Sequence, residues 1–237
     1  YRFLKVFGAD PARIVACAAG GILGTHRREY ELDPAFGEQW NVCRHTNPAG
    51  LRGGIAEALQ GADVCVAFSA GGIIKPEWVK GMARDAIVFA CANPVPEIWP
   101  WDAKDAGARI VATGRSDFPN QVNNSLVFPG MFRGLLDVRA RAITDEMAIA
   151  PAHELALCAR ERGIHEGSIL PTMDEWHVPM RLAVATAIKA QEQGLARVAR
   201  TRDQVHILAE SKIRSAHEAM RVLLREGLIV APATVRE

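Results

Sequence analysis

Side chains of the kind that bind small polar ligands are concentrated in three short segments. Segment 92–98 contains Asn93 held out of helical geometry by Pro94, and segment 114–124 carries three Asn and one Gln within positions 120–124. An Asn side chain can donate to a carboxylate and accept from a ribose hydroxyl. Segment 69–72, Ser-Ala-Gly-Gly, allows a ligand to approach the backbone closely. Each segment would equally suit a plain turn that caps its own backbone.

Motifs for phosphate binding, nucleophilic catalysis and metal binding are not found in the sequence. It has no G-x-G-x-x-G, no G-x-x-x-x-G-K-[ST] and no G-x-S-x-G, and its seven His are scattered without ligand spacing. The five Cys form no close pair, and Cys17, Cys65 and Cys91 each lie in a short apolar run that predicts burial. Unpaired thiols of this kind suit a reducing cytoplasm.

The three segments follow predicted strands. Continuous apolar runs at 63–68, 86–91 and 109–112 alternate with helical patterns at 51–60, 77–83 and 101–107. This alternation predicts an α/β fold with a parallel sheet covered on both faces. Open sheets of this class bind ligands at the carboxyl ends of their strands, where these three segments would lie.

The two ends of the chain differ from this central part. Residues 1–8 read as the last turns of a helix ended by Gly8, and 14–18 as a buried strand, so we expect a preceding strand outside this chain. From about residue 129 helices are predicted at 132–148, 151–162, 179–193 and 202–226. The sequence thus suggests the remainder of a sheet domain at 1–150 and a helical extension at 151–237.

Charge and hydropathy exclude several classes of protein. The 237 residues are 49% hydrophobic and 23% charged, with a net charge of +1 and a mean hydropathy of +0.01. Disorder is excluded, and so small a net charge gives no field for nucleic acid. No apolar run approaches the roughly 18–20 residues of a membrane span. The basic residues of 202–226 alternate with acidic ones, which predicts a solvated face beside an apolar stripe of Leu208, Ile213, Met220 and Leu223.

The ordered run of motifs resembles the malic enzymes, in particular their short prokaryotic form. The similarity lies in segments 92–98, 111–124 and 128–134 and continues through 136–140 and 145–147. It implies a Rossmann-like NAD(P)-binding sheet, lacking its first strand and glycine loop in this chain, followed by a mostly helical C-terminal region. The implied activity is oxidative decarboxylation of malate to pyruvate and carbon dioxide with reduction of NAD or NADP.

The resemblance also implies roles for individual residues. Asn93, Asn123 and Asn124 correspond to substrate-binding residues of the family. Five residues correspond to its cofactor-binding positions: Ser69, Ala70, Gly71, Asn93 and Asn123. The family's catalytic Tyr and Lys and its acidic ligands for Mg or Mn would lie in a missing N-terminal domain, so we expect no catalytic and no metal residue in this chain. A homodimer is also implied, and we expect the fragment alone to be inactive.

Two other functions remain open at this point. The chain could be a dinucleotide-binding regulatory module without catalysis, or the cofactor domain of an amino-acid dehydrogenase, which shares the fold but not the Asn-Asn loop.

The sequence also predicts which cofactor is used. NAD-specific folds place an acidic residue at the end of the second strand, where this chain has Ala18. His26, Arg27 and Arg28 follow and could pair with a 2′-phosphate. We therefore expect NADP to be accepted at least as well as NAD.

Overall fold

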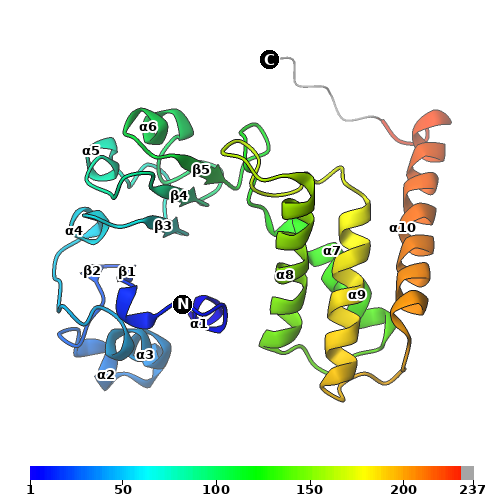
Figure 1. Ribbon diagram of the computed structural model, residues 1–237, viewed down its shortest axis with the longest axis horizontal. Coiled ribbons are helices and arrows are strands. Elements are labelled where there is room, and N and C mark those ends of the chain that lie inside the picture. The colour runs from blue at the N-terminus through cyan, green and yellow to red at the C-terminus, as the bar shows by residue number, and fades with distance from the viewer. Residues whose placement is uncertain (231–237) are drawn as a thin grey trace. The chain divides into compact units, whose positions relative to one another are not determined.

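The computed structural model describes residues 1–230, which form two compact units (Figure 1). Unit 1 contains Tyr1–Asn123 together with His165–Ile169, and unit 2 contains Asn124–Ile164 and the described residues from Leu170 onward. The domain division after residue 150 that the sequence suggests stays a prediction.

Unit 1 contains a three-stranded parallel sheet. Its strands are β3 (Val64–Ala67), β4 (Ile87–Ala90) and β5 (Ile110–Thr113), in the order β3-β4-β5. Helix α4 (Ile55–Leu59) precedes β3, and α5 (Pro76–Val79) and α6 (Pro100–Asp105) lie between the strands along the chain. The predicted α/β fold is confirmed, and the sheet core is built on Val88 and Ala90 of the central strand, both fully buried.

The prediction that both faces of the sheet are covered does not hold for β3, which has one exposed face. Cys65 is buried against the core, but Val64 and Val66 on the other face are each about half exposed. Within the described residues β3 pairs with β4 alone, which leaves it at the edge of the sheet.

The N-terminal part of unit 1 differs from its prediction. Helix α1 (Arg2–Val6) is followed by Gly8 at a φ of 89°, as predicted. The predicted buried strand 14–18 is wrong: β1 (Cys17–Ala18) is exposed and pairs antiparallel with β2 (Gly21–Ile22). Gly20 and Gly21 adopt positive φ, which turns the chain back on itself, and the expected burial of Cys17 fails with it.

The remaining elements of unit 1 are short helices. They are η1 (Pro11–Arg13), α2 (Glu29–Leu32), η2 (Pro34–Phe36) and α3 (Gly37–His45).

Unit 2 is a helical bundle. It begins with η3 (Asn124–Leu126) and contains α7 (Phe128–Asp137), α8 (Asp145–Arg162), α9 (His177–Glu192) and α10 (Arg202–Arg225). Helix α9 packs against the other three long helices, and its Leu182, Ala183 and Ala187 are fully buried (Figure 1). The predicted helical C-terminal region is confirmed.

Two details of the helix predictions are wrong. The predicted break before Pro151 lies instead at 138–144, where Arg139 has a φ of 50° and the Thr144 side chain accepts from the Met147 amide to start α8. Pro151 is accommodated inside that helix. In α10 the buried residues are Val205 and Ala209, whereas Met220 of the predicted stripe is 52% exposed.

Substitution of Gly134 by Ala should destabilise unit 2. A Cβ at this position of α7 would overlap the carbonyl group of Ala183 on α9, so one helix must shift. Such overpacking costs about 1–3 kcal/mol, and the thermal midpoint should fall by several degrees. Gly37→Ala is the control, because a Cβ there meets open space at an ordinary φ. Equal midpoints for the two variants in calorimetry would contradict this packing.

Candidate functional site

The three strands of the sheet end side by side. Ala67, Ala90 and Thr113 are partners in the strand register and are the last residues of β3, β4 and β5. The loops that follow, called here loop 68–75, loop 91–99 and loop 114–123, therefore begin at one edge of the sheet. All three predicted polar or small segments begin at this edge.

Loop 68–75 and loop 91–99 are joined along their backbones. The Gly72 amide donates to the Pro96 carbonyl and the Ile74 amide to the Glu97 carbonyl, both at 2.9 Å. Gly71 lies directly against Val95: a Cβ on Gly71 would be 2.8 Å from the Val95 carbonyl oxygen. Glycine is therefore required at this position for the two loops to approach each other.

The carboxylate of Glu97 joins the same two loops from inside the protein. The side chain is fully buried, and its Oε1 accepts from the Ser69 amide at 2.6 Å and from the Ser69 hydroxyl at 3.1 Å. Its Oε2 accepts from the Ala92 amide at 2.9 Å. Glu97 is not among the predicted site residues, and the one signal in the sequence is an acidic residue placed between the apolar Pro96 and Ile98, which would need partners if buried.

Burial and the nearby Glu97 carboxylate change the chemistry of two thiols. They raise the pKa of Cys65 and of Cys91 to about 11. Both thiols are therefore protonated at neutral pH and lack the thiolate that a nucleophile needs.

Arg115 links loop 114–123 to loop 91–99. Its Nη1 donates to the Pro94 carbonyl at 2.8 Å, while Nε and Nη2 donate to the two oxygens of Asp117. The guanidinium also lies 5.6 Å from the centre of the Trp99 ring. Hydrogen bonding to Arg115 lowers the pKa of Asp117, which stays ionised and holds the arginine in place.

The structure brings most of the predicted site residues to this edge of unit 1. Ser69, Ala70 and Gly71 are exposed in loop 68–75, and Asn93 is exposed in loop 91–99, where its bond to Pro94 is cis. Among the described residues the Asn93 side chain has no hydrogen-bond partner, so its amide is available to a ligand.

The Asn pair lies where the two units meet in the sequence. Asn123 ends the first part of unit 1, is half-buried, and donates from Nδ2 to the Gly114 carbonyl at 3.4 Å. Asn124 is exposed and begins η3 and unit 2.

Asn120, from the same polar segment, is structural. It is buried at a φ of 58°; its Nδ2 donates to the Val111 and Glu166 carbonyls and its Oδ1 accepts from the Ile169 amide. All of its hydrogen-bonding groups are therefore engaged in attaching segment 165–169 to the sheet.

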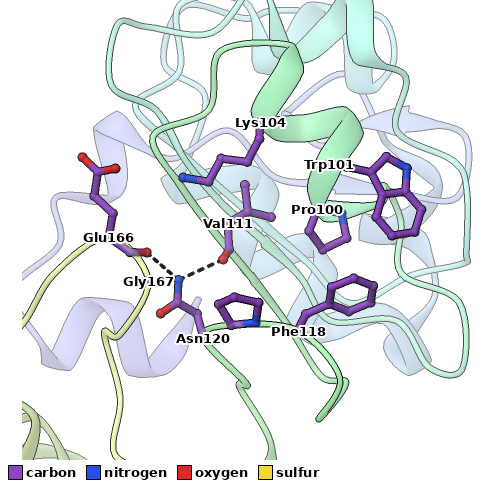
Figure 2. A pocket seen from close by; sticks show the side chains of 9 residues that line it. Pro100, Trp101, Lys104, Val111, Phe118, Asn120, Glu166 and Gly167 are labelled. Carbon is purple, nitrogen blue, oxygen red and sulfur yellow. Dashed lines mark hydrogen bonds between the residues drawn. The ribbon is translucent and has the colours of Figure 1, made fainter. Parts of the chain in front are cut away.

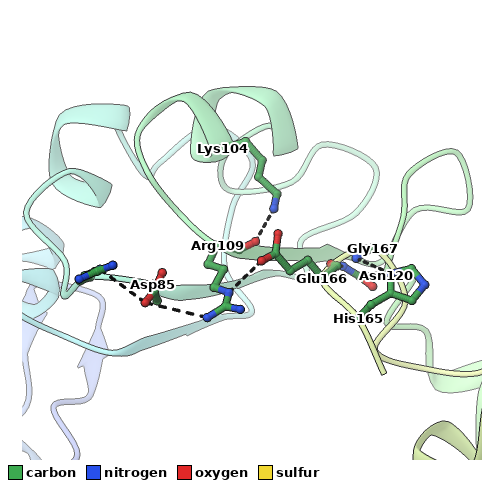
Figure 3. A network of polar contacts seen from close by, with 8 residues as sticks. Asp85, Lys104, Arg109, Asn120, His165, Glu166 and Gly167 are labelled. Carbon is green, nitrogen blue, oxygen red and sulfur yellow. Dashed lines mark hydrogen bonds and ion pairs between the residues drawn. The ribbon is translucent and has the colours of Figure 1, made fainter. Parts of the chain in front are cut away.

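A separate pocket of about 420 Å³ lies beside β5 and α6 within unit 1 (Figure 2). The rings of Trp101 and Phe118 face it from one side, and Lys104 and Glu166 lie at the other. None of the predicted ligand-binding residues lines this pocket. Glu166, which lines this pocket, forms an ion pair with Arg109 at 2.8 Å. Arg109 also pairs with Asp85 at 3.9 Å (Figure 3).

Residues 1–230 contain neither a cluster of metal-ligand side chains nor a helix suited to a membrane. Within residues 1–230 there is no group of three or more His, Cys, Asp and Glu side chains that could hold a metal ion. No helix in this range is both long and apolar enough to cross a membrane.

Comparisons with known proteins identify the family. The family model described as "Malic enzyme, NAD binding domain" matches residues 62–192, which include β3, β4, β5 and the three loops. The NAD-dependent malic enzyme of Geobacillus stearothermophilus is 45% identical over 172 residues, covering 73% of this chain and 35% of that protein. The NADP-dependent malic enzyme of Rhizobium meliloti is 38% identical over 209 residues, covering 82% of this chain and 26% of that protein.

A solved structure agrees. The malic enzyme of Entamoeba histolytica matches 98% of this chain with a TM-score of 0.94 and 46% identity, and the match covers 48% of that enzyme's chain. This chain therefore spans about half, or less, of the length of these relatives. The resemblance seen in the motifs is confirmed, and the chain belongs to the malic enzyme family, whose NAD-binding domain it carries.

Proposed function

We propose that the chain is the cofactor-binding part of an enzyme that oxidises malate and decarboxylates the product to pyruvate, with reduction of NAD or NADP. The observation that carries this proposal is the meeting of segment 69–71, Asn93 and loop 114–123 at the carboxyl edge of a parallel sheet in a chain of this family. Open α/β sheets bind their ligands at this edge.

The residues at this edge suit a dinucleotide. The small residues Ser69, Ala70 and Gly71 leave the backbone accessible, and the unengaged amide of Asn93 can accept from a ribose hydroxyl or donate to a carboxylate. A bound nicotinamide would accept the hydride that leaves the hydroxyl-bearing carbon of malate. We assign Asn123 and Asn124 to hold the malate carboxylate. Neutral amides orient it without adding a positive charge that would oppose decarboxylation.

Other parts of the reaction are assigned to residues outside this chain. We propose that a further domain supplies the proton-transfer groups and the ligands of a divalent cation, Mg or Mn, because the chain covers 35% of one relative and 26% of another. We also propose a homodimer, as the resemblance to the family implies, and a location in the cytoplasm. All five cysteines are free, which a reducing compartment favours.

The test of the proposal is a kinetic assay of the complete protein. With malate, Mg²⁺ or Mn²⁺ and either cofactor it should form pyruvate, carbon dioxide and reduced cofactor in equal amounts. Binding of cofactor without turnover would favour a non-catalytic module, and turnover of an amino acid instead of malate would favour a dehydrogenase of that class.

The structure changes the basis of the NADP prediction. Ala18 pairs antiparallel with Gly21 and does not end a strand of the parallel sheet, so the prediction now rests on the arginines that follow. Arg27 donates from Nη2 to the Ala19 carbonyl at 3.2 Å, so its guanidinium lies at the turn after Ala18. Its Nη2 also donates to the Tyr30 hydroxyl at 2.9 Å and its Nε pairs with Glu29, so a 2′-phosphate would compete with Glu29 for this side chain. Arg28 is engaged elsewhere, with Glu31 and over the ring of Trp40. Arg27 is therefore the residue best placed to meet a 2′-phosphate.

We expect kcat/KM of the complete enzyme with NADP to equal or exceed that with NAD. Arg27→Gln should lower the NADP value at least about tenfold relative to NAD, since it removes a charge-assisted bond. Glu29→Gln should raise the ratio of the NADP value to the NAD value, because it frees Arg27 from its ion pair and removes a negative charge. A tenfold preference of the wild type for NAD, about 1.4 kcal/mol, or equal effects of both variants would contradict the prediction.

A further inference from the structure

We propose that Glu97 is a positioning residue that sets the spacing of loop 68–75 and loop 91–99 and, through it, the affinity for the nicotinamide cofactor. The inference rests on the proposed function, because it takes these two loops as the cofactor-binding edge.

The Glu97 carboxylate accepts hydrogen bonds from both loops. Oε1 accepts two hydrogen bonds from Ser69, and Oε2 accepts one from Ala92, directly after β4. The side chain is fully buried beneath the edge, so water cannot replace these contacts. A carboxylate accepting from backbone amides forms stronger hydrogen bonds than a neutral acceptor.

The contact of the Glu97 carboxylate with Ser69 and Ala92 also positions the proposed cofactor-binding residues. Ser69 is itself a donor to Glu97, and Gly71 lies against Val95, two residues after Asn93. The distance between Ser69 and Asn93 therefore depends on the connection that Glu97 makes. A ligand that touches both loops would bind most tightly when this spacing is fixed in advance.

The side chain of Glu97 suits this role because it has two acceptor oxygens. The donors of Ser69 and Ala92 meet two separate oxygens, and an ionised carboxylate is an acceptor at both. Gln offers one oxygen and one NH₂ group, which would face a donor on one of the two loops. Asp retains both oxygens but is one methylene shorter. Glu97→Gln should thus break the side-chain contact to one loop and loosen the connection, which the backbone hydrogen bonds of Gly72 and Ile74 still maintain, while leaving the volume of the core nearly unchanged.

The experiment measures binding of NAD⁺ and NADP⁺ to the complete protein by titration calorimetry. In Glu97→Gln the Kd of the preferred cofactor should rise at least about tenfold, while kcat at saturating cofactor should stay within about threefold. The matched control is Glu166→Gln, which makes the same change on an exposed carboxylate paired with Arg109; its Kd should stay within about twofold of wild type.

Hydrogen exchange provides a second readout. In the free Glu97→Gln protein the amides of loop 68–75 and loop 91–99 should exchange faster than in wild type, and saturating cofactor should restore their protection. If Glu97→Gln does not fold, Glu97→Asp is measured in its place, with the same increase in Kd expected.

The possible failures are distinct. If the wild-type protein binds neither cofactor, the proposed function fails. If the wild type binds and the substituted protein binds within twofold of it, or loses thermal stability with an unchanged Kd, Glu97 is purely structural and this inference is wrong.

Discussion

The 237-residue chain alone should oxidise malate at less than about one ten-thousandth of the rate of the complete enzyme. General acid–base groups and a metal ion each raise the rate of such a reaction by about two or more orders of magnitude. We assign those groups to the rest of the protein, and residues 1–230 contain no cluster of three side chains that could hold a metal ion.

The assay uses the isolated chain with malate, both cofactors and Mg²⁺ or Mn²⁺. The complete protein at the same concentration is the positive control. Turnover by the isolated chain within a factor of about one hundred of the control would show that the catalytic groups lie inside these residues.

Replacement of Asn123 or Asn124 by Ala should reduce kcat/KM for malate roughly 10- to 100-fold in the complete enzyme. Losing one donor to a substrate carboxylate costs about 1.5–3 kcal/mol. The thermal midpoint should change little for Asn124, which is exposed, so the loss would come from substrate binding and not from folding.

Asn120→Ala is the matched control from the same segment. Its amide is engaged with Val111, Glu166 and Ile169, and its positive φ disfavours Ala, so this variant should lose stability while the folded fraction keeps normal malate kinetics. If the Asn124 variant instead behaves like the Asn120 variant, the Asn pair is structural.

The sequence allowed the sheet and its ligand edge to be predicted because both depend on local pattern. The apolar runs at 63–68 and 86–91 contain β3 and β4, and the run at 109–112 overlaps β5, which ends at Thr113; each strand end lies within one residue of the predicted end. The prediction of a buried strand at 14–18 is wrong because the apolar pattern does not reveal that Gly20 and Gly21 reverse the chain. The predicted helices 132–148 and 151–162 are divided at the wrong place, because the Thr144 side chain starts α8 and Pro151 lies inside it.

The contacts that organise the edge could not be predicted in the same way. Glu97 meets Ser69 across 28 positions of sequence, and Arg115 meets the Pro94 carbonyl across 21. Such contacts exist only after the strands align, so a pattern within one segment cannot indicate them. Asn120 and Asn123 have the same residue type and lie in one segment, and only the contacts of the folded chain show that Asn120 attaches segment 165–169 to the sheet.

The most direct test of the account is a crystal structure of the complete protein with NADP⁺ or NAD⁺ and a non-reacting analogue of malate. We predict that the nicotinamide ribose lies against segment 69–71 and Asn93, and that Asn123 and Asn124 donate to a carboxylate of the analogue. A cofactor bound elsewhere, for example in the pocket beside Trp101, with the edge of the sheet free of ligand, would contradict the account.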